Sequence, residues 1–159
     1  MSDRKDKLRA TIQADHAVSQ AIFSRLSPEQ WQQPVPSDEG AAWKARDVLA
    51  HLAASEGGQL GQATRLMAGG VTVPDDFDLN RYNRRSVQKQ AELSVADLLA
   101  VIERDHLQVL AALDTVAEAD LDKSGRHARG DMLSVEGFFH RITEHRRQHA
   151  EEVARALGI

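Results

Sequence analysis

The apolar residues of this chain recur at helical spacing in four long stretches, and strand-like alternation is scarce. The stretches cover residues 8–26, 44–67, 94–113 and 134–157. Each helix would bury one apolar side, and together the four predict an all-α four-helix bundle. A chain of 159 residues can bury a sizeable core, so we expect residues 1–159 to form a single domain.

Capping residues and polar connections divide the helices. Ser94, followed three residues later by Asp97, predicts a capping box at the start of the third helix, and Gly158 suits the end of the fourth. Residues 117–131 are polar and predict a loop. The polar residues 80–92 form either a short extra helix or a long crossover, which indicates that the bundle is not a simple up-down design.

Composition and charge exclude several classes of protein. The formal net charge is −4, which lacks the basic footprint of nucleic-acid binders, so we expect no nucleic-acid partner. No run approaches the ~18 apolar residues of a membrane span, and the charged N-terminus predicts no signal peptide. We therefore expect a cytosolic protein without a membrane partner. The chain has no cysteine, so any thiol chemistry needs a thiol from outside.

Two histidines lie on the apolar side of the fourth helix. His145 and His149 are one turn apart, so both imidazoles can reach one metal ion. Roughly 0.3 such pairs are expected by chance, and the spacing alone fits two hydrogen-bonded or half-exposed histidines equally well. Their place on the apolar side favours a metal, because each buried imidazole needs partners for its donor and its acceptor. The sequence His-Arg-Arg-Gln-His lacks the glutamate of a His-Glu-x-x-His protease.

Further candidates lie on the other helices. His51 is at the boundary of the second helix's apolar side, one turn after Asp47, which could accept its second ring N–H. His16 and His106 each follow an isoleucine by four residues and are candidates to line a pocket or supply a fourth ligand, although pairing with carboxylates in the core is the commoner fate. Glu56 is a candidate proton acceptor beside the pocket. No residue is assigned a catalytic role.

Other polar residues are expected to face solvent. Arg146 and Arg147 flank the histidine motif and could meet an anionic substrate, but solvation of the helix is the simpler interpretation. His127 and His140 are expected to be exposed or to lie in loops.

Three segments carry a family resemblance. Residues 43–53 (Trp-Lys-Ala-Arg-Asp-Val-Leu-Ala-His-Leu-Ala) and residues 143–153 (Thr-Glu-His-Arg-Arg-Gln-His-Ala-Glu-Glu-Val) resemble the second-helix and last-helix signatures of the DinB-like superfamily. Residues 26–31 (Leu-Ser-Pro-Glu-Gln-Trp) are also typical of it. This superfamily includes the bacillithiol transferases and the N-terminal domain of mycothiol-dependent maleylpyruvate isomerase.

The resemblance implies a four-helix bundle with a long crossover connection and one three-histidine site. By motif matching, the ligands fall on His51, His145 and His149, and the ion would be zinc or nickel, with iron or manganese as alternatives. It also implies a homodimer. The chain departs from the pattern at Lys44, where many relatives have a Ser or Thr that caps the helix.

Three neutral imidazoles leave coordination positions open, as in a catalytic metal site. The first hypothesis is a metal-dependent enzyme that activates a low-molecular-weight thiol, as an S-transferase, or water, as a hydrolase, toward a small-molecule substrate. The alternative is a non-catalytic protein that binds or sequesters a small-molecule ligand through the metal. A third reading is a structural or stress-induced dimer with a vestigial site. The sequence does not choose the substrate or the ion.

Overall fold

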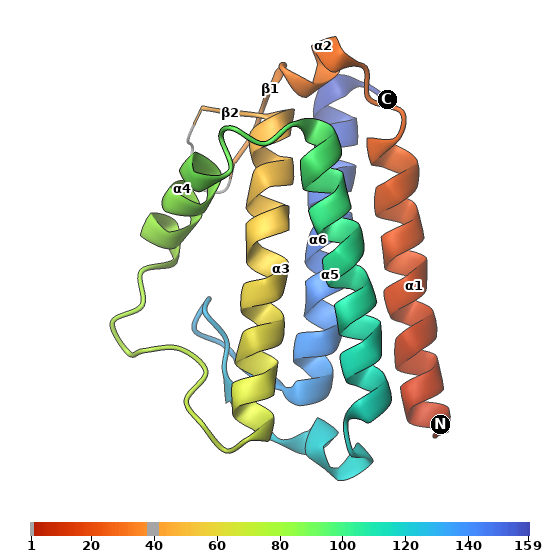
Figure 1. Ribbon diagram of the computed structural model, residues 1–159, viewed down its shortest axis with the longest axis vertical. Coiled ribbons are helices and arrows are strands. Elements are labelled where there is room, and N and C mark those ends of the chain that lie inside the picture. The colour runs from red at the N-terminus through yellow and green to blue at the C-terminus, as the bar shows by residue number, and fades with distance from the viewer. Residues whose placement is uncertain (1, 38–41) are drawn as a thin grey trace.

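The computed structural model describes residues 2–37 and 42–159. Four long helices lie side by side as a bundle (Figure 1), which confirms the predicted fold class. They are α1 (Asp3–Phe23), α3 (Ala45–Met67), α5 (Val95–Thr115) and α6 (Val135–Leu157). Helices α1 and α6 run in one direction, and α3 and α5 run in the other. Helix α6 packs against both α1 and α3, which brings the second and fourth predicted helices together.

The parallel arrangement of α3 and α5 requires the chain to return along the outside of the bundle. Residues 68–78 and helix α4 (Leu79–Lys89) form this return (Figure 1), so the extra helix and the long crossover are both present. Asp78 caps α4 by accepting the Arg81 N–H at 2.9 Å. Helix α4 approaches α3 closely at Gly58, where an added Cβ would lie 3.3 Å from Tyr82 Oη.

Capping residues define the ends of α5 and α6 as expected. Ser94 and Asp97 form the predicted capping box at the start of α5, and Gly158 adopts the left-handed conformation at the end of α6, with φ of 71°. At the start of α3, Lys44 offers no acceptor, and Asp47 accepts the Lys44 N–H at 2.9 Å instead. Asp47 thus caps the start of α3.

Several short elements close the ends of the bundle. Helix α2 (Pro28–Trp31) opens with a capping box, and β1 (Pro34–Val35) pairs antiparallel with β2 (Trp43–Lys44). At the opposite end are the 3-10 helix η1 (Glu118–Asp122) and the hairpin of β3 (Ser124–Arg126) and β4 (Met132–Ser134). The predicted loop over residues 117–131 therefore contains short regular structure. These strands are too short to show a period of two in the sequence.

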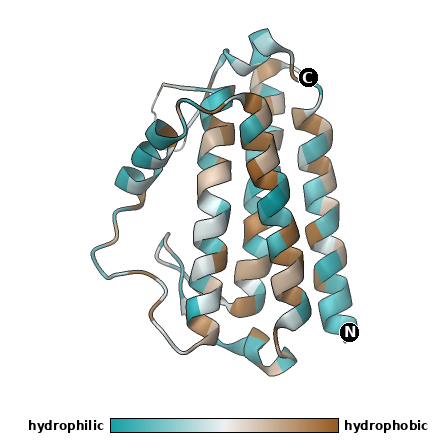
Figure 2. Ribbon diagram, viewed as in Figure 1, coloured by the Kyte–Doolittle hydropathy of each residue, from teal (hydrophilic) through white to brown (hydrophobic). Residues whose placement is uncertain are grey.

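A polar layer crosses the middle of the bundle between two apolar clusters. One cluster, around Leu49 and Ile102, lies toward α2, and the other, around Val109 and Phe138, lies toward η1. Between them each long helix contributes buried polar side chains: Ser19 on α1, Glu56 on α3, Asp105 and His106 on α5, and Thr143, Arg146 and His149 on α6. Along α5 in Figure 2, hydrophilic turns separate hydrophobic ones.

No helix within the described residues is long and apolar enough to cross a membrane.

Candidate metal centre

Three imidazoles from two helices converge at one point of the polar layer. His51 comes from the second turn of α3, and His145 and His149 come from α6. One ring nitrogen from each of the three lies within 4.8 Å of the others. The Nε2 atom of His145 is 3.4 Å from Nε2 of His51 and 3.0 Å from Nε2 of His149. The convergence expected from the spacing and the resemblance is therefore present.

The spacing of these nitrogens fits a shared ion. Metal–nitrogen bonds of ~2.0–2.1 Å at a tetrahedral angle place two ligand nitrogens about 3.3 Å apart. The two Nε2 separations, 3.4 and 3.0 Å, lie on either side of this value. The rings meet nearly at right angles, with interplanar angles of 81° to 82°, and their Nε2 atoms are the atoms that approach one another.

The surroundings of His145 keep this histidine in the form that binds metals. Burial, together with the neighbouring His149 and His51, lowers the pKa of His145 well below its ordinary value of 6.5. Neutral imidazole is the metal-binding form. The Glu152 carboxylate lies 3.2 Å from Nδ1 of His149, where it favours a proton on Nδ1 and leaves the Nε2 lone pair toward the centre. The Trp43 ring packs 5.4 Å from the His51 ring and covers that side.

Arg146 is buried, and the expectation that it solvates the helix is wrong. Its side chain is 0% exposed and makes two bonds to the Glu56 carboxylate, of 2.5 and 2.6 Å. It also donates to Nδ1 of His16. A guanidinium can occupy the core here because α3 supplies a carboxylate in bidentate geometry. Burial raises the pKa of Glu56 to about 7, against the opposing effect of Arg146. Arg147, in contrast, is partly exposed and pairs with Asp15 and Glu151.

His16 and His106 lie in the polar layer, apart from the three converging histidines. Their rings stack at 3.6 Å with an interplanar angle of 6°. Nε2 of His16 is 2.9 Å from the Glu103 carboxylate, so this histidine pairs with a carboxylate and with Arg146. Burial lowers the pKa of His106 to about 4. Neither histidine, nor Glu56, is among the described residues that line the cavity beside the centre.

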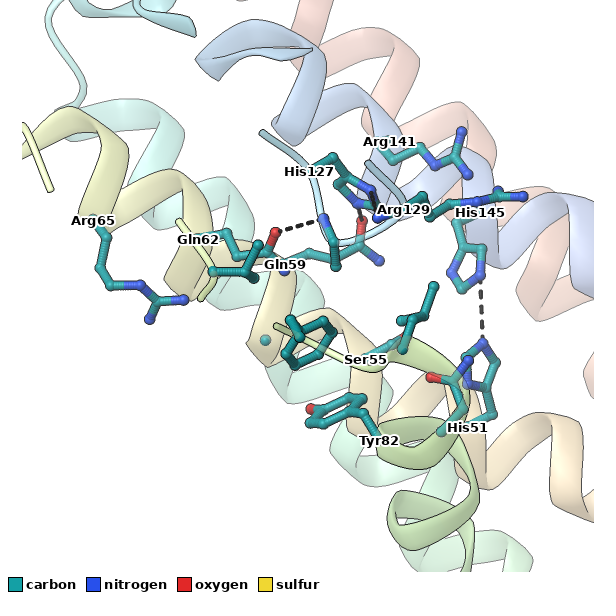
Figure 3. Close-up of a pocket in the computed structure, with 16 residues that line it drawn as sticks. His51, Ser55, Gln59, Gln62, Arg65, Tyr82, His127, Arg129, Arg141 and His145 are labelled. Carbon is teal, nitrogen blue, oxygen red and sulfur yellow. Dashed lines mark hydrogen bonds between the residues drawn. The ribbon is translucent and has the colours of Figure 1, made fainter. Parts of the chain in front are cut away.

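A cavity of about 160 Å³ opens beside the three histidines (Figure 3). His51 and His145 form part of its wall, together with α3, α4 and the loop that joins β3 to β4. The apolar part of the lining consists of Val73, Phe77, Leu79 and Tyr82. A molecule held in this cavity therefore lies next to the point where the imidazoles meet.

Sequence patterns missed the contribution of the hairpin loop to this cavity. His127 was expected to be exposed or to lie in a loop. It lies in a loop, but it is buried, with 5% of its surface exposed. Its ring packs on Phe138, and its Nε2 is 3.4 Å from Gln59 Oε1. Burial lowers its pKa to about 4. His140 lies on α6, where its side chain is 44% exposed, 3.7 Å from the Glu144 carboxylate.

The chain matches a known protein family over most of its length. The profile of the DinB superfamily matches residues 11–153, which is most of the chain. The chain belongs to the DinB superfamily. The matched range includes His51, His145 and His149. A comparison with curated proteins finds no match.

Solved structures share the DinB fold at low sequence identity. ClbS, a colibactin self-resistance protein crystallised in complex with a dsDNA, has a TM-score of 0.79 at 11% identity, over 98% of this chain and 96% of its own. YfiT from Bacillus subtilis, described as a probable metal-dependent hydrolase with an unusual four-helix bundle topology, has a TM-score of 0.68 at 20% identity, over 99% and 90%. An uncharacterised protein from Clostridium difficile 630 has a TM-score of 0.73 at 16% identity, over 98% and 96%.

The prediction that nucleic acid is excluded as a partner is wrong. It rested on the net charge of −4, but ClbS, a protein with this DinB fold, was crystallised with a dsDNA. Net charge averages the whole surface, whereas contact with a phosphate backbone needs only a local basic patch. Helix α4 of this chain has that local character, since residues 79–89 hold four basic side chains and no acidic one: Arg81, Arg84, Arg85 and Lys89.

Proposed function

We propose that this protein is a metal-dependent enzyme, in which His51, His145 and His149 hold one divalent ion at the wall of the cavity. The convergence of the three imidazoles to within 4.8 Å carries the proposal, because two of the three also line the space that a substrate would occupy. YfiT, which has the same fold and is described as a probable metal-dependent hydrolase, supports it. Zinc and nickel are among the ions that imidazole ligands suit.

The bound ion would lower the pKa of a water molecule or an external low-molecular-weight thiol, so that an anionic nucleophile is present at neutral pH. The residues of the chain supply position and orientation. Glu152 fixes the His149 ring through Nδ1, and Trp43 shields the outer side of His51. Since His51 and His145 line the cavity, an ion held by them would lie beside a substrate bound along α3 and α4.

The test is turnover by the zinc-loaded and the nickel-loaded protein. The protein is incubated with an electrophilic substrate and with each of a panel of thiols or with water alone, and the wild type is compared with His149→Ala. The matched control is His140→Ala, a partly exposed histidine on the same helix outside the cluster. We expect activity in the wild type and in H140A and its loss in H149A. Equal rates in wild type and H149A with every thiol and with water would refute the enzyme. Saturable binding without product would favour the sequestration alternative.

The basic helix α4 supports contact with DNA as a second candidate function. Its four cations lie on the crossover, outside the bundle (Figure 1), and ClbS was crystallised with a dsDNA. Phosphate contacts made by these side chains would make binding weaken steeply as salt is raised. Fluorescence anisotropy with a labelled duplex tests this. We expect Arg81→Gln/Arg85→Gln to weaken binding and to flatten its salt dependence. Binding that is absent, or unchanged in that variant, excludes a role for α4.

A further inference from the structure

The cavity beside the three histidines is electropositive. Its described lining residues include the arginines Arg65, Arg129 and Arg141 and no carboxylate. Arg65 and Arg129 are exposed, so solvent and salt screen their charges, whereas Arg141 is half-buried and is screened less. The three guanidinium groups together favour an anion at this cavity, with Arg141 as the strongest contributor. A bound divalent cation would add to the same field.

Two of these arginines have donors to offer a ligand. Arg65 is already engaged, because its Nε and Nη2 donate to the Thr72 carbonyl oxygen at 3.2 and 2.7 Å. In contrast, Nη2 of Arg141 is buried and has no hydrogen-bond partner within the described residues. The Arg129 side chain has no hydrogen bond or ion pair there, but this residue is exposed, so its guanidinium is open to water and to a ligand alike. The buried Arg141 donor is different, because a buried cationic donor without an acceptor is costly, which indicates that a ligand supplies one.

Arg129 and Arg141 lie close to the histidine cluster. Arg141 is one turn before His145 on α6, and Arg129 is in the loop between β3 and β4. Figure 3 shows both beside His145 and His127, and both lower the pKa values of these two histidines through their charge. An anionic group held by these arginines therefore lies in the same cavity as His51 and His145.

The rest of the cavity limits what the anion can be. An apolar cavity of ~150 Å³ holds a molecule of the size of benzene. The present space, of about 160 Å³, has an apolar wall that includes Phe77 and Tyr82. Its enclosed part thus fits a small ring or a short aliphatic chain rather than a nucleotide.

We propose that the substrate is a small organic oxyanion, with its carboxylate or phosphate on Arg129 and Arg141, its apolar body against Phe77 and Tyr82, and its reactive end toward His51 and His145. This assignment rests on the proposed function for the reaction at the ion. Recognition of the anion, however, depends on the two arginines and can be measured without the metal.

Isothermal titration calorimetry on the chelator-treated protein tests the anion site. The probes are benzoate, phenyl phosphate and the neutral isostere benzamide, and the proteins are wild type, Arg129→Gln, Arg141→Gln and the matched control Arg25→Gln. Arg25 is exposed and outside the cavity lining. We expect benzoate or phenyl phosphate to bind and benzamide to bind at least about tenfold more weakly, and each cavity variant to lose about tenfold or more in affinity. The R25Q control should match the wild type.

Comparing the affinities of benzoate and phenyl phosphate shows whether the site prefers a carboxylate or a phosphate. Either preference supports an oxyanion. No binding of either probe, equal affinity for benzamide, or unchanged affinity in both R129Q and R141Q would overturn the proposal. Because the metal is removed, a failure of the metal site leaves the expected anion binding intact. Circular dichroism of each variant shows whether a loss of affinity reflects misfolding.

Discussion

The ion pair between Glu56 and Arg146 gives a sharp test of the polar layer. Both side chains are 0% exposed, and two bonds of 2.5 and 2.6 Å join them. In Glu56→Gln the shape is nearly kept, but the guanidinium loses its counter-charge in the core. Breaking a buried pair in this way costs about 3–5 kcal/mol in the free energy of unfolding. For a chain of 159 residues that corresponds to a melting temperature roughly 6–20 °C lower.

Urea unfolding of chelator-treated protein measures this cost, at a pH well above the pKa of about 7 that burial gives Glu56, so that the wild-type carboxylate is ionised. Glu103→Gln is the matched control, because its carboxylate also meets the layer at His16 but is 48% exposed, and such a pair is worth about 0–1 kcal/mol. The double variant Glu56→Leu/Arg146→Met removes both charges and should recover most of the loss, so the two single effects should not add. A loss below about 1 kcal/mol in E56Q, or additive effects of E56L and R146M, would refute the description of this pair.

Three further predictions follow from the site. Zinc added to 100 times its dissociation constant should stabilise the protein by about 2.7 kcal/mol, and a chelator should reverse the rise in melting temperature; a melting temperature independent of zinc would contradict the site. Glu152→Ala should weaken zinc binding about 10–100-fold in a competition titration, whereas an effect below twofold would show that Glu152 does not orient His149. The metal-free protein should lose stability as the pH falls from 6.5 toward 4. Four histidines have lower pKa values in the folded state than in the unfolded state, so the unfolded state binds more protons in this range and is favoured by acid. These histidines are His16, His106, His127 and His145. The raised pKa of Glu56 acts in the opposite direction, so urea midpoints that rise on acidification would show that the carboxyl dominates.

The sequence predicted the helices well because their signals are local. Apolar periodicity over twenty residues or so and capping residues such as Ser94 and Gly158 act within one helix, and α5 begins and α6 ends beside these two residues. Helix α1 differs from its prediction, since it covers Asp3–Phe23 and not residues 8–26. His51 was placed by the family signature, since its spacing alone relates it to no residue on α6.

The rest of the site depends on partners that are distant in the sequence. Arg146 was expected in solvent because no nearby residue in the sequence indicates a partner for it. The carboxylate that pairs with it in the core, Glu56, is 90 residues away on α3. The same holds for His127 and Arg129, which reach the cavity only because a hairpin folds back beside α3. The net charge of the whole chain also gave no indication of the basic helix α4. Relying on net charge led to the wrong exclusion of nucleic acid as a partner.

Anomalous diffraction across the metal edges, from crystals of protein purified without chelators or a nickel resin, tests the central claim most directly. We predict one anomalous peak per chain, ~2.0–2.1 Å from the Nε2 atoms of His51, His145 and His149, with an open coordination position toward the cavity. A peak bound by other residues, or none at this point after zinc is added in excess, would contradict the metal centre.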